Sequence, residues 1–268
     1  MVKKLIKYDF QSYFRLLLPV QLILIGIAAV NRIVQFFENS DSTVYTSIFT
    51  SSLVLYIIAI IVLLLMTVIV SIVRFYQGMY TNEGYLSHTL PVTPAQHITA
   101  KLLTSFLFYL GTLLAVFLSF MVITLGDVNI EIFKAFGYLA RQFFSEYGFQ
   151  GAIYIAEAVL ALIALCATTF LLYYFCISVG QLVSRKKVLL AFGVYFGLYV
   201  LSQIAGTILI ILITLSPEWL DNIIGWLSDY PETAAHIYLC SMFVIDSVLG
   251  TVYFLSTKYI MGKKLNLT

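Results

Sequence analysis

Six long apolar runs, separated by polar segments, dominate the hydrophobic pattern of the chain. Each run is close to or above the length of about 20 residues that a helix needs to cross the hydrocarbon of a bilayer. The pattern therefore predicts an all-α integral membrane protein with a single transmembrane domain over residues 1–268. We place the six predicted spans at residues 16–37, 44–73, 102–125, 152–179, 188–215 and 236–257.

Residues 1–15 precede the first predicted span and follow a different pattern. Basic and polar side chains at spacings of three and four share one helical face, aliphatic and aromatic side chains share the other, and Asp9 lies near the boundary. This pattern is typical of a helix on the membrane surface, so we predict an N-terminal amphipathic interfacial helix. A charged tail that only fixes the topology is the alternative. Pro19 lies near the entrance of the first span, where a missing backbone donor is tolerated.

Composition agrees with lipid as the main solvent of the chain. Hydrophobic residues make up 61% and charged residues 10% of it, against about 25% charged residues in soluble domains. Twelve of the 15 lysines and arginines fall in residues 1–15, 74–101, 180–187 and the basic tail 258–268. The positive-inside rule therefore predicts that both termini are cytoplasmic. We expect a multi-pass protein of the bacterial plasma membrane, and topology alone explains these basic residues without nucleic acid.

Two predicted external segments are long enough to have structure of their own. Residues 126–150 have mixed helical character and are expected to lie against the membrane. Residues 216–235 contain both tryptophans, and Ser216 followed by Pro217 has the pattern of a helix start. A short helix in the outer interface and an ordinary loop anchored by Trp219 and Trp226 both fit this segment, because tryptophan favours the interface.

The longest polar interruption on the predicted cytoplasmic side is the segment 74–101. Asn82 and Gly84 favour a turn that ends the helix leaving the second span. Thr93 followed by Pro94, with Gln96 at the third helical position, predicts the start of the helix that enters the third span. Between them, residues 83–90 present an apolar patch in water, which requires a protein partner or a lipid surface.

The segment and the layout around it resemble the bacterial ABC-2 type permease subunits. The resemblance covers nearly the whole chain in layout. The residues that carry it are Glu83-Gly84-Tyr85-Leu86, Thr89-Leu90-Pro91-Val92 and the helix start at Thr93. In that family the corresponding segment is a coupling helix that docks on a separate ATP-binding subunit, and the permease forms a dimer around the substrate path.

The resemblance implies a partner-coupling role for six residues: Glu83, Gly84, Tyr85, Leu86, Leu90 and Pro91. It also implies a second permease copy or a homologous permease as partner, with ATP-Mg bound by the ATP-binding subunit and no cofactor bound by this chain. The remaining spans do not align with the family by motif, so no substrate contacts carry over.

The chain contains no G-x-x-x-x-G-K-[ST], H-E-x-x-H or G-x-S-x-G motif. We therefore expect that it is not an enzyme, has no catalytic residues, and takes any energy it uses from another chain. Two other functions fit the pattern: an ion-coupled secondary transporter with Asp246 as the carrier, and a scaffold or sensor subunit that transports nothing.

Three ionisable residues lie within the predicted spans: Asp246 near the middle of the sixth, and Glu157 and Arg32 a turn or two inside the fourth and first. A charge at this depth costs about 2.5–3.5 kcal/mol on insertion scales. Asp246 is predicted to belong either to a substrate or ion path or to a structural hydrogen bond with Ser241, Ser247, Gln203 or a neighbouring helix. Arg32 and Glu157 are expected to reach the outer surface or to pair with each other.

Metal binding is not expected from the histidines or the cysteines. His88 and His97 have no second ligand at metal spacing, and His236 is expected at the membrane boundary. Cys166, Cys176 and Cys240 are spread through apolar runs, a pattern that indicates neither a disulfide framework nor a zinc site.

Overall fold

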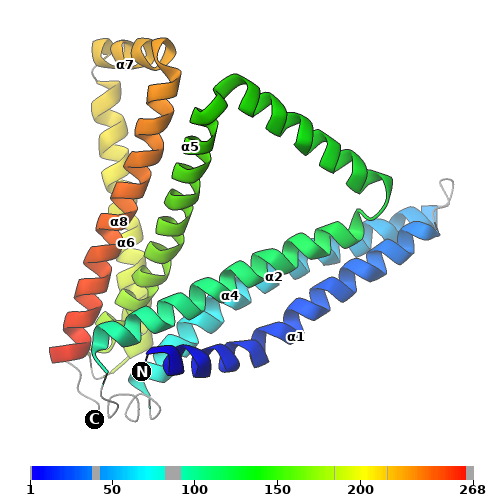
Figure 1. Cartoon of the computed structure of the whole chain (residues 1–268). Coiled ribbons are helices and arrows are strands. Elements are labelled where there is room, and N and C mark those ends of the chain that lie inside the picture. Colours follow the sequence, from blue (N-terminus) through cyan, green and yellow to red (C-terminus); the bar gives the residue numbers. More distant parts are fainter. Residues whose placement is uncertain (1, 38–42, 82–91, 184, 216, 264–268) are drawn as a thin grey trace. The chain divides into compact units, whose positions relative to one another are not determined.

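Long α-helices make up almost all of the described chain (Figure 1). The computed structural model describes residues 2–37, 43–81, 92–183, 185–215 and 217–263, and no strand occurs among them. The helices are α1 (Val2–Phe36), α2 (Thr43–Tyr80), α4 (Pro94–Ile123), α5 (Asp127–Gly180), α6 (Lys187–Thr214), α7 (Pro217–Asp229) and α8 (Pro231–Lys263). In these ranges six helices are long and apolar enough to cross a membrane, which confirms the predicted class.

The chain forms two compact units, residues 1–146 and 147–268. The boundary lies beside Gly148, a non-helical residue within α5 that has φ 52° and ψ −127°. Glycine adopts this left-handed φ without the penalty that a Cβ would bring. The part of α5 before Gly148 is the helix that the sequence suggested for the external segment 126–150, and its position against the membrane stays a prediction.

The first unit is built on α1, α2 and α4, which pack along most of their length (Figure 1). The bonded pairs Tyr13–Ser105 and Gln21–Thr112 advance in the same direction, so α1 and α4 run parallel. The pairs Tyr56–Ser119 and Thr67–Thr112 advance in opposite directions, so α2 runs antiparallel to α4 and therefore to α1. Its core has two apolar clusters: Leu24, Ala28, Tyr56, Leu63 and Ile123 in one, and Tyr13, Leu17, Val70 and Phe108 in the other.

Hydrogen bonds between side chains also join the three helices. The Tyr56 and Ser119 hydroxyls lie 2.9 Å apart, and Thr112 lies 3.0 Å from Thr67 and accepts from Gln21 at 3.1 Å. Each such bond between membrane helices contributes roughly 0.6 kcal/mol. These hydroxyl and amide groups are therefore satisfied by their neighbours, as the hydrocarbon environment requires.

The segment predicted as an interfacial helix and the first predicted span form one continuous helix, α1. Pro19 lies inside α1, and the helix bends along its length (Figure 1), as expected for a helix with an internal proline. Tyr13 and Leu17 are 1% and 0% exposed, so packing on the neighbouring helices holds the segment together across the predicted boundary. Whether the first turns lie on the membrane surface stays a prediction.

The helix ends on either side of residues 82–91 agree with the prediction. α2 ends at Tyr80, just before the predicted break at Asn82. α4 begins at Pro94 behind a complete capping box, in which the Thr93 hydroxyl accepts from the Gln96 amide at 3.4 Å. In return, the Gln96 side chain accepts from the Thr93 amide at 3.0 Å.

The second unit contains the later part of α5 together with α6, α7 and α8. A tight turn joins α5 to α6, where a Cβ on Gly180 would lie 2.7 Å from the Lys187 carbonyl oxygen. α5 and α8 run parallel, because the contacts of Tyr154, Thr168 and Phe175 of α5 all keep the same offset to their partners Glu232, Asp246 and Tyr253 of α8. α7 begins at Pro217, which favours the short helix over the ordinary loop for this segment, and its place in the outer interface stays a prediction.

Candidate functional site

The six predicted coupling residues, Glu83 to Leu86 together with Leu90 and Pro91, lie outside the described residues, as does His88. The candidate site is therefore built from the helices that lead into and out of this segment. Both of these helices, α2 and α4, pack on α1 at the end where the segment lies.

An ion pair joins α1 and α4 at that end of the first unit. Lys101 Nζ of α4 donates to Asp9 Oδ1 of α1 at 2.9 Å, and the two side chains are 9% and 23% exposed. Gly78 of α2 makes room for the lysine, because a Cβ on Gly78 would lie 2.6 Å from Nζ and 2.8 Å from Cε. All three helices therefore meet at the Asp9–Lys101 pair, two turns into α4 from Thr93.

The next turn of each helix continues the same contact. The Tyr13 hydroxyl lies 2.9 Å from Ser105 Oγ, and both residues are buried. The Tyr13 ring stacks on Phe108 with 5.1 Å between centroids, and the Phe10 ring lies 4.7 Å from Phe108. A displacement of the start of α4 must therefore move α1 or break buried polar and aromatic contacts.

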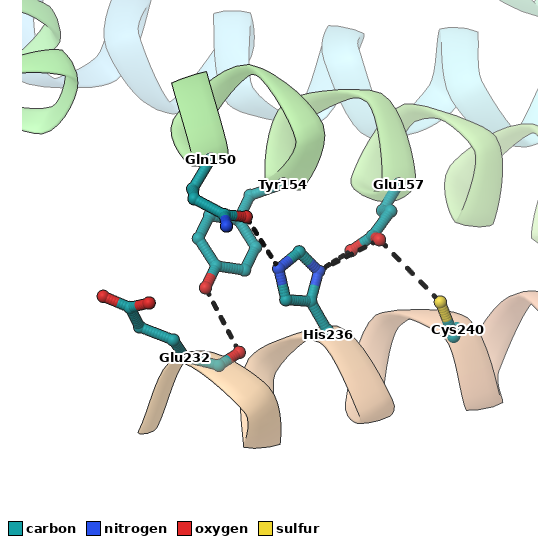
Figure 2. A network of polar contacts seen from close by, with 6 residues as sticks. All are labelled: Gln150, Tyr154, Glu157, Glu232, His236 and Cys240. Carbon is teal, nitrogen blue, oxygen red and sulfur yellow. Dashed lines mark hydrogen bonds and ion pairs between the residues drawn. The ribbon is translucent and has the colours of Figure 1, made fainter. Parts of the chain in front are cut away.

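A second polar cluster lies between α5 and α8 in the second unit (Figure 2). His236 Nδ1 lies 2.8 and 3.0 Å from the two carboxylate oxygens of Glu157, and its Nε2 lies 3.3 Å from Gln150 Oε1. The Tyr154 ring stacks on the imidazole at 4.3 Å, while its hydroxyl donates to the Glu232 carbonyl oxygen at 3.1 Å. Oxygen atoms of Glu157 and Gln150 thus face both ring nitrogens of His236.

This cluster gives Glu157 a partner that the sequence did not identify. Glu157 bonds to His236 and accepts a long contact of 3.9 Å from Cys240 Sγ. Glu157 and His236 share a predicted depth near the outer ends of the fourth and sixth spans, and that shared depth is the one signal that could have pointed to the pair. His236 is thus part of a network as well as near the predicted membrane boundary.

Arg32 is satisfied within its own turn of α1. Its Nη1 donates to Gln35 Oε1 at 2.7 Å, and its guanidinium lies 4.9 Å from the centre of the Phe36 ring. Gly126 lies close to the same guanidinium, because a Cβ added to this glycine would be 3.2 Å from Arg32 Nη2. The φ of Gly126, +119°, is one that glycine adopts readily. These partners all lie within the first unit, and the two alternatives for Arg32, reaching the outer surface or pairing with Glu157 of the second unit, stay predictions.

Asp246 is half-buried on α8, beside the closest approach of α8 to α5. Its backbone oxygen accepts from Thr168 Oγ1 at 2.7 Å, and a Cβ on Gly250 would lie 2.8 Å from the same hydroxyl. The Asp246 carboxylate makes no hydrogen bond or ion pair within the part of the chain that the structure describes. The predicted structural bonds of this side chain to Ser241, Ser247 or Gln203 are thus not among its contacts there.

Neither cluster has the composition of a metal site. Within the described ranges, no three histidine, cysteine, aspartate or glutamate side chains lie together in a way that could hold a metal ion. At the Asp9–Lys101 pair the helices α1, α2 and α4 contact one another. The His236 cluster joins α5 and α8 through hydrogen bonds.

Comparison with protein-family models, curated proteins and solved structures found no match to this chain.

Proposed function

We propose that this chain is the membrane permease subunit of an ATP-driven ABC exporter. A dimer of permease chains would form the substrate path, and a separate ATP-binding subunit would act on it through residues 83–91. The sequence resemblance motivates this proposal. The observation that supports it best is the packing of α1, α2 and α4 at the Asp9–Lys101 pair.

In the proposed mechanism, ATP-driven closure of the partner subunits pulls the two coupling segments together. Each segment connects α2 to α4, so its displacement is applied to the ends of both helices. Lys101 and Ser105 of α4 bond to Asp9 and Tyr13 of α1, and these bonds carry the displacement to α1. The first unit then tilts as a rigid body, and the path alternates between the two sides of the membrane.

Energy comes from the partner in this proposal, because this chain has no P-loop motif. ATP-Mg would be bound by the ATP-binding subunit alone. Export, the bacterial plasma membrane and cytoplasmic termini belong to the same proposal, since they follow from the family resemblance and the positive-inside rule.

The test is co-purification of the tagged chain from solubilised native membranes, followed by mass spectrometry. We expect an ATP-binding subunit in stoichiometric amount, and we expect the double variant Tyr85→Asp/Leu86→Asp to lose it by tenfold or more. Two buried charges in a docking surface remove at least about 1.4 kcal/mol, which corresponds to that factor.

The chain offers a matched control for this experiment. Gly137-Tyr138-Leu139 repeats the tripeptide Gly84-Tyr85-Leu86, and its tyrosine and leucine are 69% and 62% exposed on α5. The variant Tyr138→Asp/Leu139→Asp should keep the partner, because positive-inside topology predicts the other side of the membrane for it. Recovery of the chain without an ATP-binding subunit would contradict the proposal and favour the scaffold or the ion-coupled transporter.

A further inference from the structure

A hollow of about 350 Å³ lies between α1 and α2, at the same end of the first unit as the Asp9–Lys101 pair. We call it the arginine hollow. It is lined by Tyr8, Gln11, Ser12, Arg15 and Leu16 of α1 and by Arg74 of α2. The polar residues of α1 recur at spacings of three and four, so they form one stripe. Its size falls in the range of about 300–1,000 Å³ that is usual for small-molecule sites.

The arginine hollow has positive charge that no ion pair among the described residues balances. Helices α1, α2 and α4 contain a single acidic residue, Asp9, and Asp9 is already paired with Lys101 at 2.9 Å. Arg15 and Arg74 form no ion pair among the described residues. Two neighbouring guanidinium groups repel each other, and an anion between them relieves that repulsion.

The chemistry of the lining selects a phosphate group with an apolar extension. Guanidinium groups bind phosphate through two parallel hydrogen bonds, and Gln11, Ser12 and Tyr8 supply further hydrogen-bonding groups. Leu16 is 44% exposed at the edge of the hollow and continues into the apolar surface of α1. A ligand in this position therefore has a charged end on the arginines and a hydrocarbon end along the helix.

We propose that the arginine hollow binds the phosphate headgroup of an anionic phospholipid. The lipid belongs to the leaflet at the N-terminal end of α1, the inner leaflet by the positive-inside rule. Basic pockets between membrane helices on that side are suited to anionic headgroups, and surface arginines there attract anionic lipid. The site is independent of the ATP-binding partner and remains if the proposed function is wrong.

Native mass spectrometry of the purified full chain, titrated with phosphatidylglycerol in detergent, tests the proposal. Each arginine is expected to raise the affinity for an anionic headgroup about fivefold. The variant Arg15→Gln/Arg74→Gln, which removes both, should therefore bind phosphatidylglycerol about 25-fold more weakly. Arg15→Lys/Arg74→Lys keeps both charges and should keep most of the affinity. The matched control Lys134→Gln/Arg141→Gln removes two charges from α5 and should bind like the unaltered chain.

Three further comparisons decide the source of the phosphate group. Phosphatidylcholine should bind more weakly than phosphatidylglycerol, and inorganic phosphate at millimolar concentration should not displace the lipid. Equal affinity of the unaltered chain and the Arg15→Gln/Arg74→Gln variant for phosphatidylglycerol would overturn the proposal. So would equal binding of the two lipids, or a full effect of inorganic phosphate. The comparison of the two lipids on the unaltered chain keeps the test decisive if the glutamine variant does not fold.

Discussion

Gly78 is the residue on which the junction of α1, α2 and α4 depends most directly. A methyl group there would overlap Lys101 Nζ, at 2.6 Å, so the end of the lysine side chain must shift, and we expect this shift to weaken its bond to Asp9. Loss of a charge-assisted hydrogen bond costs about 1.5–3 kcal/mol. We expect Gly78→Ala to lower the melting temperature of the purified chain in a thermal-unfolding measurement.

Two comparisons separate this effect from the general cost of changing a membrane-helix glycine. Gly111 lies in α4 with open space at its Cβ position, so Gly111→Ala should leave the melting temperature unchanged or raise it, since alanine favours helix. In an Asp9→Asn background, Gly78→Ala should cost much less, because the ion pair is already gone. Equal effects of Gly78→Ala in the two backgrounds would contradict the assignment.

At the scale of the helices, small residues allow α5 and α8 to pack closely where Thr168 of α5 faces Gly250 of α8. The Cβ position on Gly250 lies 3.7 Å from Thr168 Cβ, within the range of about 3.5–4.5 Å that a disulfide requires. In a background with Cys166, Cys176 and Cys240 changed to alanine, Thr168→Cys/Gly250→Cys should therefore cross-link on mild oxidation. Alkylation of the remaining free thiols, followed by mass spectrometry, measures the yield.

The control places the first cysteine one position along α5. Thr169 points about 100° away from Thr168 on the same helix, so Thr169→Cys/Gly250→Cys should keep both thiols free. Cross-linking of the Thr169 pair at the rate of the Thr168 pair would show that α5 and α8 do not hold the observed register.

The sequence predicted where the helices lie along the chain better than it predicted which residues of different helices pack together. Apolar run length and capping chemistry predicted the six long helices and the α4 start at Thr93, because both signals are local. The continuation of residues 2–15 into the first span accompanies the burial of Tyr13 against α4, a contact between residues 92 positions apart. The His236–Glu157 bond likewise spans 79 residues, and a single sequence contains no signal for such pairings beyond similar depth.

At the scale of the whole molecule, much apolar surface is left for lipid or another chain to cover. No residue of α6 is buried, and in the described part of α8 only Gly250, Thr257, Ile260 and Met261 are buried. In water such helices would expose far more hydrocarbon than a soluble protein tolerates. The side of the membrane on which each helix end lies is then set by the distribution of charge, not by packing.

Cysteine labelling of intact cells tests this predicted topology. In the background without native cysteines, Glu146→Cys should react with a membrane-impermeant maleimide, because residues 126–150 are predicted to be external. Leu182→Cys, in the predicted cytoplasmic turn, should react only after the cells are permeabilised. Both positions are exposed, so a difference in labelling reports the side of the membrane and not burial. The opposite pattern would place residues 82–91 outside the cell, where no ATP-binding subunit can reach them, and would contradict the proposed function together with the topology.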